Sequence, residues 1–271
     1  MLLSVVLFTT ANALVKTIGH LPTTQIVFVR SVISLVLCAA YVKYRGFPFL
    51  GVNKKWLLIR GATGMVGLTL FFYTVQNIPL ATATVIQYLS PIFTVILAMV
   101  YLNQKVRPIQ WVFMGMALMG VVVLNGLDPN VPIRFIGIGI LSAFFASVAY
   151  YATIRCAATD HPVLVVMYFH LLATPLMGTV SLIDWAPMES EEWLTGLSVG
   201  VISVFAQVAM AVAITREDAS VVTPFKYVGA VIAWIVGIVA FDEHLGILGT
   251  AGILIVSSGV VLNTLARRYN W

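Results

Sequence analysis

Charged residues are scarce in this sequence. Only 9% of its 271 residues are Asp, Glu, Lys or Arg, whereas 61% are hydrophobic. A soluble globular domain is about half apolar and about one quarter charged. The apolar runs are about 20 residues long, which is the length of helix that crosses a bilayer. The composition therefore excludes a soluble protein and indicates an all-α membrane protein.

Cysteine and the sequence motifs of common enzymes are also scarce or missing. The two cysteines, Cys38 and Cys156, lie inside apolar runs, so we expect neither a disulfide framework nor a metal site. The sequence contains no HExxH motif, no P-loop and no glycine-rich dinucleotide motif. No loop is long enough to hold an ATP-binding domain. We therefore expect no cofactor and no enzymatic activity, and any energy for transport would come from a gradient or from exchange.

Short connections rich in polar residues, Pro and Gly divide the chain into ten predicted membrane spans. Each span is long and apolar enough to cross a lipid bilayer. We therefore expect ten transmembrane helices surrounded by membrane lipid. The predicted spans are residues 1–18, 23–42, 55–76, 80–102, 108–127, 134–156, 163–184, 193–214, 219–241 and 246–265.

The basic residues predict how the chain is oriented. With the N-terminus in the cytoplasm, ten spans return the C-terminus to the same side, and the outer segments hold only Lys16 and Arg134. Cytoplasmic loops carry an excess of Lys and Arg in membrane proteins. The net charge of +5 therefore reports topology and not nucleic-acid binding. We expect a multi-pass protein of the bacterial inner membrane with both termini cytoplasmic. The basic residues on the cytoplasmic side are Lys43, Arg45, Lys54, Lys55, Lys105, Arg107, Arg155, Arg216, Arg267 and Arg268.

The chain repeats itself at an offset of 139 residues. The stretch ATATVIQYLSPIFTVILAMVYLNQKV (81–106) aligns with SVVTPFKYVGAVIAWIVGIVAFDEHL (220–245), which places Gln87-Tyr88 over Lys226-Tyr227. Five spans in each half is an odd number, so the second half must enter the membrane upside down. We predict two inverted five-helix repeats, residues 1–127 and 134–271, which is typical of secondary transporters. The alternative is chance similarity between two apolar stretches.

Several long motifs resemble one known family. LPTTQIVFVRSVISLVL, RGATGMVGLTLFFYTVQNIPLATATVIQYLSPIFTVILAMVYLNQKV and DEHLGILGTAGILIVSSGVVL are similar to segments of the drug/metabolite transporter superfamily, EamA type. The resemblance implies a ten-helix exchanger or facilitator of small metabolites. One position departs from the pattern: the family usually has a Glu at the end of the fourth helix, where this chain has Gln104, while the second half keeps Glu243.

Two cations inside the predicted spans are the main candidates for function. An ionisable side chain within a span costs about 2.5–3.5 kcal/mol on insertion scales, so it usually faces a cavity or a partner. Lys226 and Arg30 have no acid nearby in the sequence, and we predict that together they bind a carboxylate or a phosphate. The alternatives are that Lys226 snorkels to the inner interface and that Arg30 bonds helix-end carbonyls or Asp242.

Polar and aromatic residues at helical spacing extend this prediction. They recur on one face of the predicted helix around Lys226 and on one face of its repeat mate around Gln87. Pro224 lies two residues before Lys226 and is predicted to open the helix there; the alternative is a mild kink. Ordinary helix packing is the alternative for the aromatic residues. The candidates on these faces are Gln87, Tyr88, Tyr227 and Trp234.

Four further polar residues lie inside apolar spans. His170 is either a proton relay or a buried neutral side chain bonded to a carbonyl. Asn12 and Tyr151 are repeat mates, and Gln207 is a lone amide. Each of these three is either a ligand contact or an interhelical hydrogen bond.

We therefore expect a secondary transporter of a small metabolite with a carboxylate or a phosphate. One alternative is a transporter of neutral or zwitterionic amphipathic metabolites, such as amino acids or nucleosides. A remote alternative is a membrane lipid enzyme that uses Asp242, Glu243 and His244. The sequence leaves open whether transport is coupled to a proton or to a counter-substrate. It also leaves open whether the protein is a monomer or a homodimer.

Overall fold

The computed structural model describes residues 1–78, 80–125, 131–232, 235 and 247–269, and every regular element in these ranges is a helix. The predicted all-α class is therefore confirmed for this part of the chain. The helices are α1 (Leu2–Thr17), α2 (Thr23–Tyr44), α3 (Lys54–Asn77), α4 (Leu80–Gln87), α5 (Ser90–Leu102), α6 (Pro108–Asn125), α7 (Ile133–Cys156), α8 (Pro162–Ser181), α9 (Ser190–Arg216), α10 (Ala219–Val222), the 3₁₀ helix η1 (Thr223–Tyr227) and α12 (Ile247–Arg268).

Six stretches within the described ranges are helical, long and apolar enough to cross a membrane. Shorter apolar helices cover Leu2–Val15, Pro108–Val123 and Ala219–Ile232. The multi-pass helical architecture follows from these lengths, because a helix of about 20 residues spans the hydrocarbon core. The count of ten spans stays a prediction. The six long stretches are Thr23–Tyr44, Ala83–Leu102, Ile133–Cys156, Pro162–Ser181, Ser190–Arg216 and Leu248–Ala266.

The chain forms two compact units. Unit 1 contains residues 1–2, 66–151 and 216–271, and unit 2 contains residues 3–65 and 152–215. Each unit therefore combines helices from both predicted repeats. The boundaries of the two compact units differ from those of the predicted repeats, residues 1–127 and 134–271, and these repeats stay a prediction.

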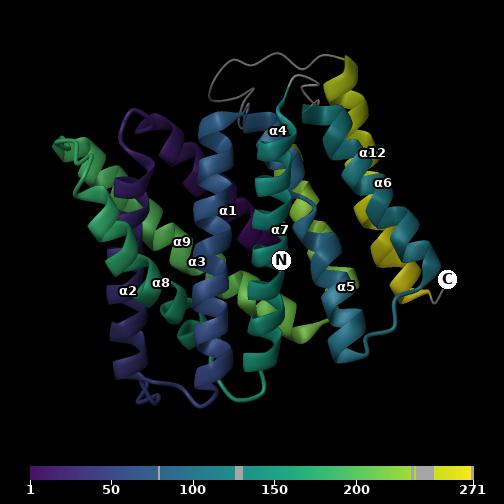
Figure 1. Ribbon diagram of the computed structural model, residues 1–271. Helices are drawn as coiled ribbons and strands as arrows, with labels where there is room; N and C mark the ends of the chain where they lie inside the picture. The colour runs from purple at the N-terminus through teal and green to yellow at the C-terminus, as the bar shows by residue number, and fades with distance from the viewer. Residues whose placement is uncertain (79, 126–130, 233–234, 236–246, 270–271) are drawn as a thin grey trace. The chain divides into compact units, whose positions relative to one another are not determined.

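Unit 1 contains a closely packed pair of helices, α6 and α12, which lie side by side (Figure 1). Glycine permits this approach: a Cβ atom on Gly120 would lie 2.6 Å from the Val256 nitrogen, and one on Gly259 would lie 2.7 Å from the Ala117 nitrogen. Gly120 and Gly259 are 139 positions apart, as are Ala117 and Val256. Equivalent positions of the two halves therefore make reciprocal contacts, as a local two-fold relation requires.

Unit 2 contains the corresponding pair α2 and α8, which also lie side by side (Figure 1). Two neighbouring helices approach this pair closely: a Cβ atom on Gly200 of α9 would lie 2.8 Å from Ile33 side-chain atoms of α2, and one on Gly61 of α3 would lie 2.8 Å from the Leu172 side chain of α8. These residues are again equivalent at the offset of 139. The repeat in the sequence thus corresponds to reciprocal packing inside each unit, which chance similarity does not explain.

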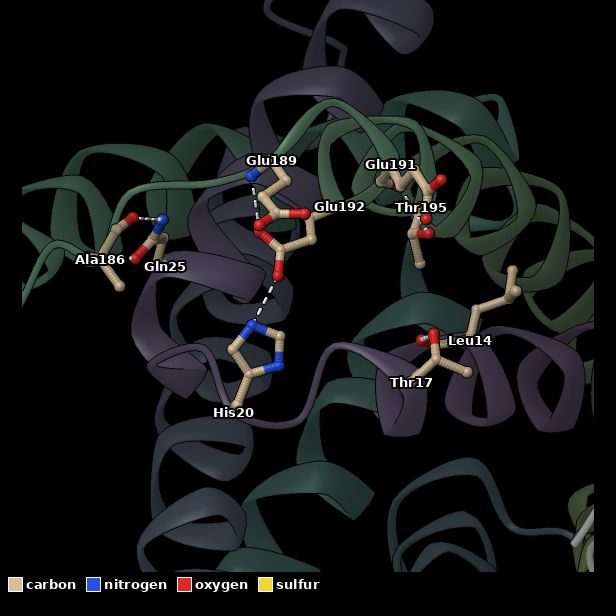
Figure 2. Close-up of polar contacts among 9 residues, drawn as sticks. All are labelled: Leu14, Thr17, His20, Gln25, Ala186, Glu189, Glu191, Glu192 and Thr195. Atoms are coloured by element: carbon tan, nitrogen blue, oxygen red, sulfur yellow. Dashed lines mark hydrogen bonds and ion pairs between the residues drawn. The ribbon is translucent and has the colours of Figure 1, made fainter.

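Buried polar side chains fasten the loops of unit 2. Gln25 at the start of α2 is fully buried, and its amide bonds both the nitrogen and the carbonyl oxygen of Ala186, at 2.9 and 2.8 Å. Figure 2 shows this pair beside the ion pair of His20 with Glu192. In another loop contact of the unit, Asp160 accepts hydrogen bonds from the backbone nitrogens of Val52 and Asn53 at 2.6 and 2.9 Å. These contacts fix the helix ends without placing any group in the middle of a span.

Candidate functional site

The helix that carries Lys226 is irregular at that residue. The α-helical turn α10 gives way to the 3₁₀ helix η1 at Thr223, and Pro224 occupies the first turn of η1. Proline removes one backbone donor and disfavours a regular α-helix. The helix thus changes from α to 3₁₀ geometry beside Lys226, and an opening of the helix there stays a prediction.

The equivalent segment of the first half is also interrupted. Helix α4 ends at Gln87, residues 88 and 89 form a turn, and α5 begins at Ser90 with Pro91 in its first turn. Gln87 and Lys226 are repeat mates, so unit 1 has an irregular helix at the same position of each half. Discontinuous helices of this kind commonly form the binding sites of secondary transporters.

Hydroxyl groups surround the ammonium group of Lys226. Its Nζ donates to the Tyr150 hydroxyl at 2.7 Å and to the Ser90 Oγ at 3.3 Å, and it lies 3.9 Å from the centre of the Tyr150 ring. Within the described part of the chain, no carboxylate lies within ion-pair distance of this ammonium. Both hydroxyl partners are neutral, so the positive charge of Lys226 is oriented but not cancelled.

Two predicted tyrosines meet beside this centre. The rings of Tyr88 and Tyr227 lie 5.7 Å apart and are inclined at 58°. Tyr227 is fully buried, and its hydroxyl has no hydrogen-bond partner. The ring pair offers an apolar surface with one buried polar atom that is still unpaired.

The other predicted residues of unit 1 lie in different contacts. The Ser142 hydroxyl lies 2.9 Å from the Gln87 Oε1 and 2.8 Å from the Gly67 carbonyl oxygen, so Gln87 joins α4 to α7. Tyr151 is buried with its ring 5.8 Å from that of Tyr101. Trp234 lies outside the described residues.

Unit 2 brings together His170 of α8 and Gln207 of α9. The His170 Nε2 lies 3.0 Å from the Gln207 Nε2, and both side chains are buried. The second ring nitrogen, Nδ1, is buried without a hydrogen-bond partner. The expected bond from His170 to a carbonyl is therefore replaced by a bond to an amide.

The remaining two candidates are also in unit 2. Arg30 of α2 is half-buried, and its Nε has no hydrogen-bond partner. Asp242, which was its alternative partner, lies outside the described residues together with Glu243 and His244. Asn12 lies on an exposed face of α1.

Sequence reasoning missed the partners of Lys226. Tyr150 is the neighbour of the predicted Tyr151, and Ser90 lies three residues beyond Gln87. The helical spacing from Gln87 to Ser90 was available as a signal, because residues three apart share a face. No sequence signal joins Tyr150 to Lys226, since 76 positions separate them.

The described residues contain no group of three or more His, Cys, Asp or Glu side chains that could hold a metal ion. The two cysteines are free and buried, and they pack in the same apolar cluster of unit 2. The arrangement offers neutral hydrogen-bonding groups and cations, which suit recognition of a solute.

Comparison with known proteins gives consistent results. The EamA-like transporter family matches residues 1–126 and 134–265. The pseudopaline exporter CntI of Pseudomonas aeruginosa is 30% identical over 83% of this chain and 80% of that protein. The riboflavin transporter of Vibrio cholerae is 27% identical over 76% of this chain and 71% of that protein. The S-adenosylmethionine uptake transporter of Rickettsia prowazekii is 24% identical over 89% of this chain and 83% of that protein.

A solved crystal structure has the same fold. Its TM-score is 0.85 at 20% sequence identity, and the match covers 99% of this chain and 96% of that chain. At this identity the likeness concerns the fold alone. The family matches and the fold thus agree with the helical class and with the internal repeat that the sequence predicts.

Proposed function

Because the chain belongs to the EamA-like transporter family, within the drug/metabolite transporter superfamily, we propose that it carries a small metabolite with a carboxylate or a phosphate across the bacterial inner membrane. The relatives named above are transporters of small molecules. The observation that carries the proposed substrate class is the environment of Lys226.

The Lys226 ammonium is held among neutral groups. Its two hydrogen-bond partners are hydroxyls, and a lysine ammonium has three donors, so the partners fix its direction while its charge persists. The bond to Ser90 places the ammonium beside the middle of the apolar stretch Ala83–Leu102. A cation at such a position is costly unless it meets water or an anion. A carboxylate or phosphate on the solute supplies that anion.

The irregular helices support the same location. Both halves interrupt their helices at equivalent positions in unit 1, next to Gln87 and Lys226. We propose that the solute binds there and that alternating access exposes it to each side in turn, with ten inverted spans and both termini in the cytoplasm.

A second candidate substrate class is a zwitterionic amphipathic metabolite. The paired rings of Tyr88 and Tyr227 favour it, because they offer an apolar surface close to the cation. In that case Lys226 binds the carboxylate and the tyrosines contact the apolar body. Both candidates require the positive charge of Lys226.

Transport in liposomes tests this proposal. Uptake of labelled anionic, zwitterionic and cationic metabolites is measured for the parent protein and for Lys226→Met. We expect anionic or zwitterionic solutes to be transported and Lys226→Met to abolish their uptake. Lys105→Met is the matched control, because Lys105 lies in the connection after α5, outside the helices. Transport of cations alone, unchanged in Lys226→Met, would contradict the proposal.

A further inference from the structure

Unit 2 contains a group of buried polar atoms that the Lys226 centre does not use. Five side-chain atoms in α2, α8 and α9 are buried and have no hydrogen-bond partner. Native proteins satisfy most buried polar atoms, so such a concentration calls for an explanation. The five atoms are Arg30 Nε, Ser31 Oγ, His170 Nδ1, Thr174 Oγ1 and Ser203 Oγ.

Two hydrogen bonds fix the helices that carry these atoms. The Ser34 hydroxyl donates to the Gly200 carbonyl oxygen at 3.1 Å, which joins α2 to α9. Gln207 contacts His170 at 3.0 Å, which joins α9 to α8. Ser203 lies between Gly200 and Gln207 on the same face of α9, because residues three and four apart share a face. The unpaired hydroxyl of Ser203 therefore lies between the two interhelical contacts.

The same helical spacing places the other unpaired hydroxyls. Ser31 precedes Ser34 by three residues, and Thr174 follows His170 by four residues. Helices α2 and α8 pack against each other. The three helices thus present unpaired polar atoms to one region of unit 2.

The unpaired nitrogens are donors. Because the amide nitrogen of Gln207 can only donate, the His170 Nε2 accepts, and the ring proton is on Nδ1. The Nε of Arg30 is a donor in every state of the protein. Neither donor has an acceptor in the structure. The missing partner is therefore a hydrogen-bond acceptor.

The charge in this region is positive. Arg30 keeps its charge at every physiological pH. Both Arg30 and Arg60 lie near enough to His170 to act on its ring electrostatically, and the Arg60 guanidinium lies 5.4 Å from the centre of the Phe169 ring. In the described ranges, no carboxylate lies within ion-pair distance of Arg30. The missing acceptor is therefore expected to carry negative charge.

Part of this group has no polar equivalent in the other half. At the offset of 139, the repeat mates of Arg30, Ser203 and Gln207 are Phe169, Gly64 and Leu68, whereas Ser31 and His170 are mates of each other. The positions equivalent to Arg30, Ser203 and Gln207 are therefore filled without a hydrogen-bonding side chain. The polar groups of these three residues point to a role in binding.

We propose that Arg30, His170 and Gln207, with the hydroxyls around them, form a second oxyanion site, buried in unit 2 and separate from the Lys226 centre, that takes a carboxylate or phosphate group. The inference rests on the proposed function, because it assumes an anionic solute. The donors are covered in this structure.

Nuclear magnetic resonance of the full chain in detergent tests the site. The four histidines are labelled with ¹⁵N, and the signal of His170 is assigned with His170→Gln. Sodium acetate and sodium phosphate are the probes, and acetamide and sodium chloride are the controls. We expect a saturable shift of the Nδ1 signal with an oxyanion and none with acetamide. The titrations with acetate and with phosphate distinguish a site for a carboxylate from a site for a phosphate.

Substitution of Arg30 shows whether the shift belongs to this site. We expect Arg30→Gln to weaken the apparent affinity for the oxyanion at least tenfold. Arg134→Gln removes one positive charge from an exposed position and is the matched control. If Arg30→Gln does not fold, Gln207→Leu replaces it, since leucine is the residue at the equivalent position of the first half. Equal affinities of the variant and Arg134→Gln would contradict the proposal.

Two outcomes separate this proposal from the proposed function. A His170 signal insensitive to both oxyanions would show that internal water alone satisfies the donors, and it would overturn the site. A saturable shift in a protein that transports no solute in liposomes would support the site while contradicting the proposed function. Lys226→Met is expected to lose transport and to keep the His170 titration.

Discussion

In unit 1 the cation Lys226 donates to the hydroxyls of Tyr150 and Ser90, whereas in unit 2 the Nε of Arg30 and the Nδ1 of His170 have no hydrogen-bond partner. Both centres lie in apolar helical stretches. The first centre holds its cation in a fixed direction, and the second leaves its donors unpaired.

This difference separates two ways of keeping a charge inside a membrane protein. Neutral hydroxyls orient an ammonium and lower its cost without removing its charge. Unpaired donors are costly in every state that offers them no acceptor. We therefore expect unit 1 to lose function when its cation is removed, and unit 2 to lose function when its donors are removed, without loss of the fold.

The largest effect is expected when both cations are removed. Each of Lys226→Met and Arg30→Gln removes one partner of a charged pair, which costs about 3 kcal/mol, or about a hundredfold in apparent affinity for the solute. Lys226 lies in unit 1 and Arg30 in unit 2, and Lys226→Met is expected to keep the His170 titration. We therefore expect the two losses to multiply in the double variant, as they do at independent sites.

Initial uptake rates over a range of solute concentrations are measured for the parent, both single variants and the double variant. A double variant that is no worse than the poorer single variant would contradict this independence and would show that the two cations act on the same anion.

The next effect concerns the amide that orients His170. Gln207→Leu removes the contact with the His170 Nε2, and leucine occupies the equivalent position of the first half. Losing one buried hydrogen bond costs about 1 kcal/mol of stability, which lowers Tm by only a few degrees, and we expect uptake to fall about tenfold because His170 loses its orientation. Thermal unfolding of the purified protein and uptake in liposomes are compared. A large loss of Tm with normal uptake would show that Gln207 is purely structural.

A smaller effect is expected at the partner of Lys226. Tyr150→Phe removes the hydroxyl that accepts from the Nζ at 2.7 Å but keeps the ring. The Lys226 charge remains, so we expect a rise of a few-fold in KM with little change in the maximal rate. Concentration-dependent uptake measures both parameters. An effect as large as that of Lys226→Met would show instead that the Tyr150 hydroxyl contacts the solute.

The smallest effect is expected at the contact of His20 with Glu192, which neither centre uses. The His20 side chain is 65% exposed and contacts Glu192, whose side chain is 14% exposed (Figure 2). Exposed pairs contribute about 0–1 kcal/mol, so His20→Gln should leave Tm almost unchanged and uptake at the parental level. A clear loss of uptake would show that this loop contact takes part in transport. It would also contradict the expectation that only the charged groups of the two buried centres affect uptake.

Much of the fold follows from the sequence because membrane insertion depends on local composition. Long apolar runs must form helices in lipid, where every backbone polar group has to be bonded internally. The positions of α1, α2, α3, α6 and α8 accordingly lie within a few residues of the predicted spans. The irregularity of the helix at Thr223–Tyr227 was predictable for the same reason, since a proline such as Pro224 acts on the backbone of its own helix.

The candidate site was only partly predictable. Lys226, Arg30 and His170 are conspicuous in apolar sequence, because each is polar where lipid or packing favours apolar residues. Their partners are not conspicuous. Tyr150 and Gln207 lie on other helices, and a tyrosine or an amide occurs in a membrane helix for many reasons.

The sequence by itself determined the helical class, the family and the internal repeat, because these depend on hydrophobicity and on residue types at fixed spacing. Only the tertiary structure decided which polar groups meet. It paired Lys226 with Tyr150 and His170 with Gln207, and it left Arg30 without a bond at its Nε. The reason is physical: hydrogen bonds reach about 3 Å, and whether two side chains come that close depends on how helices pack, which no local pattern contains.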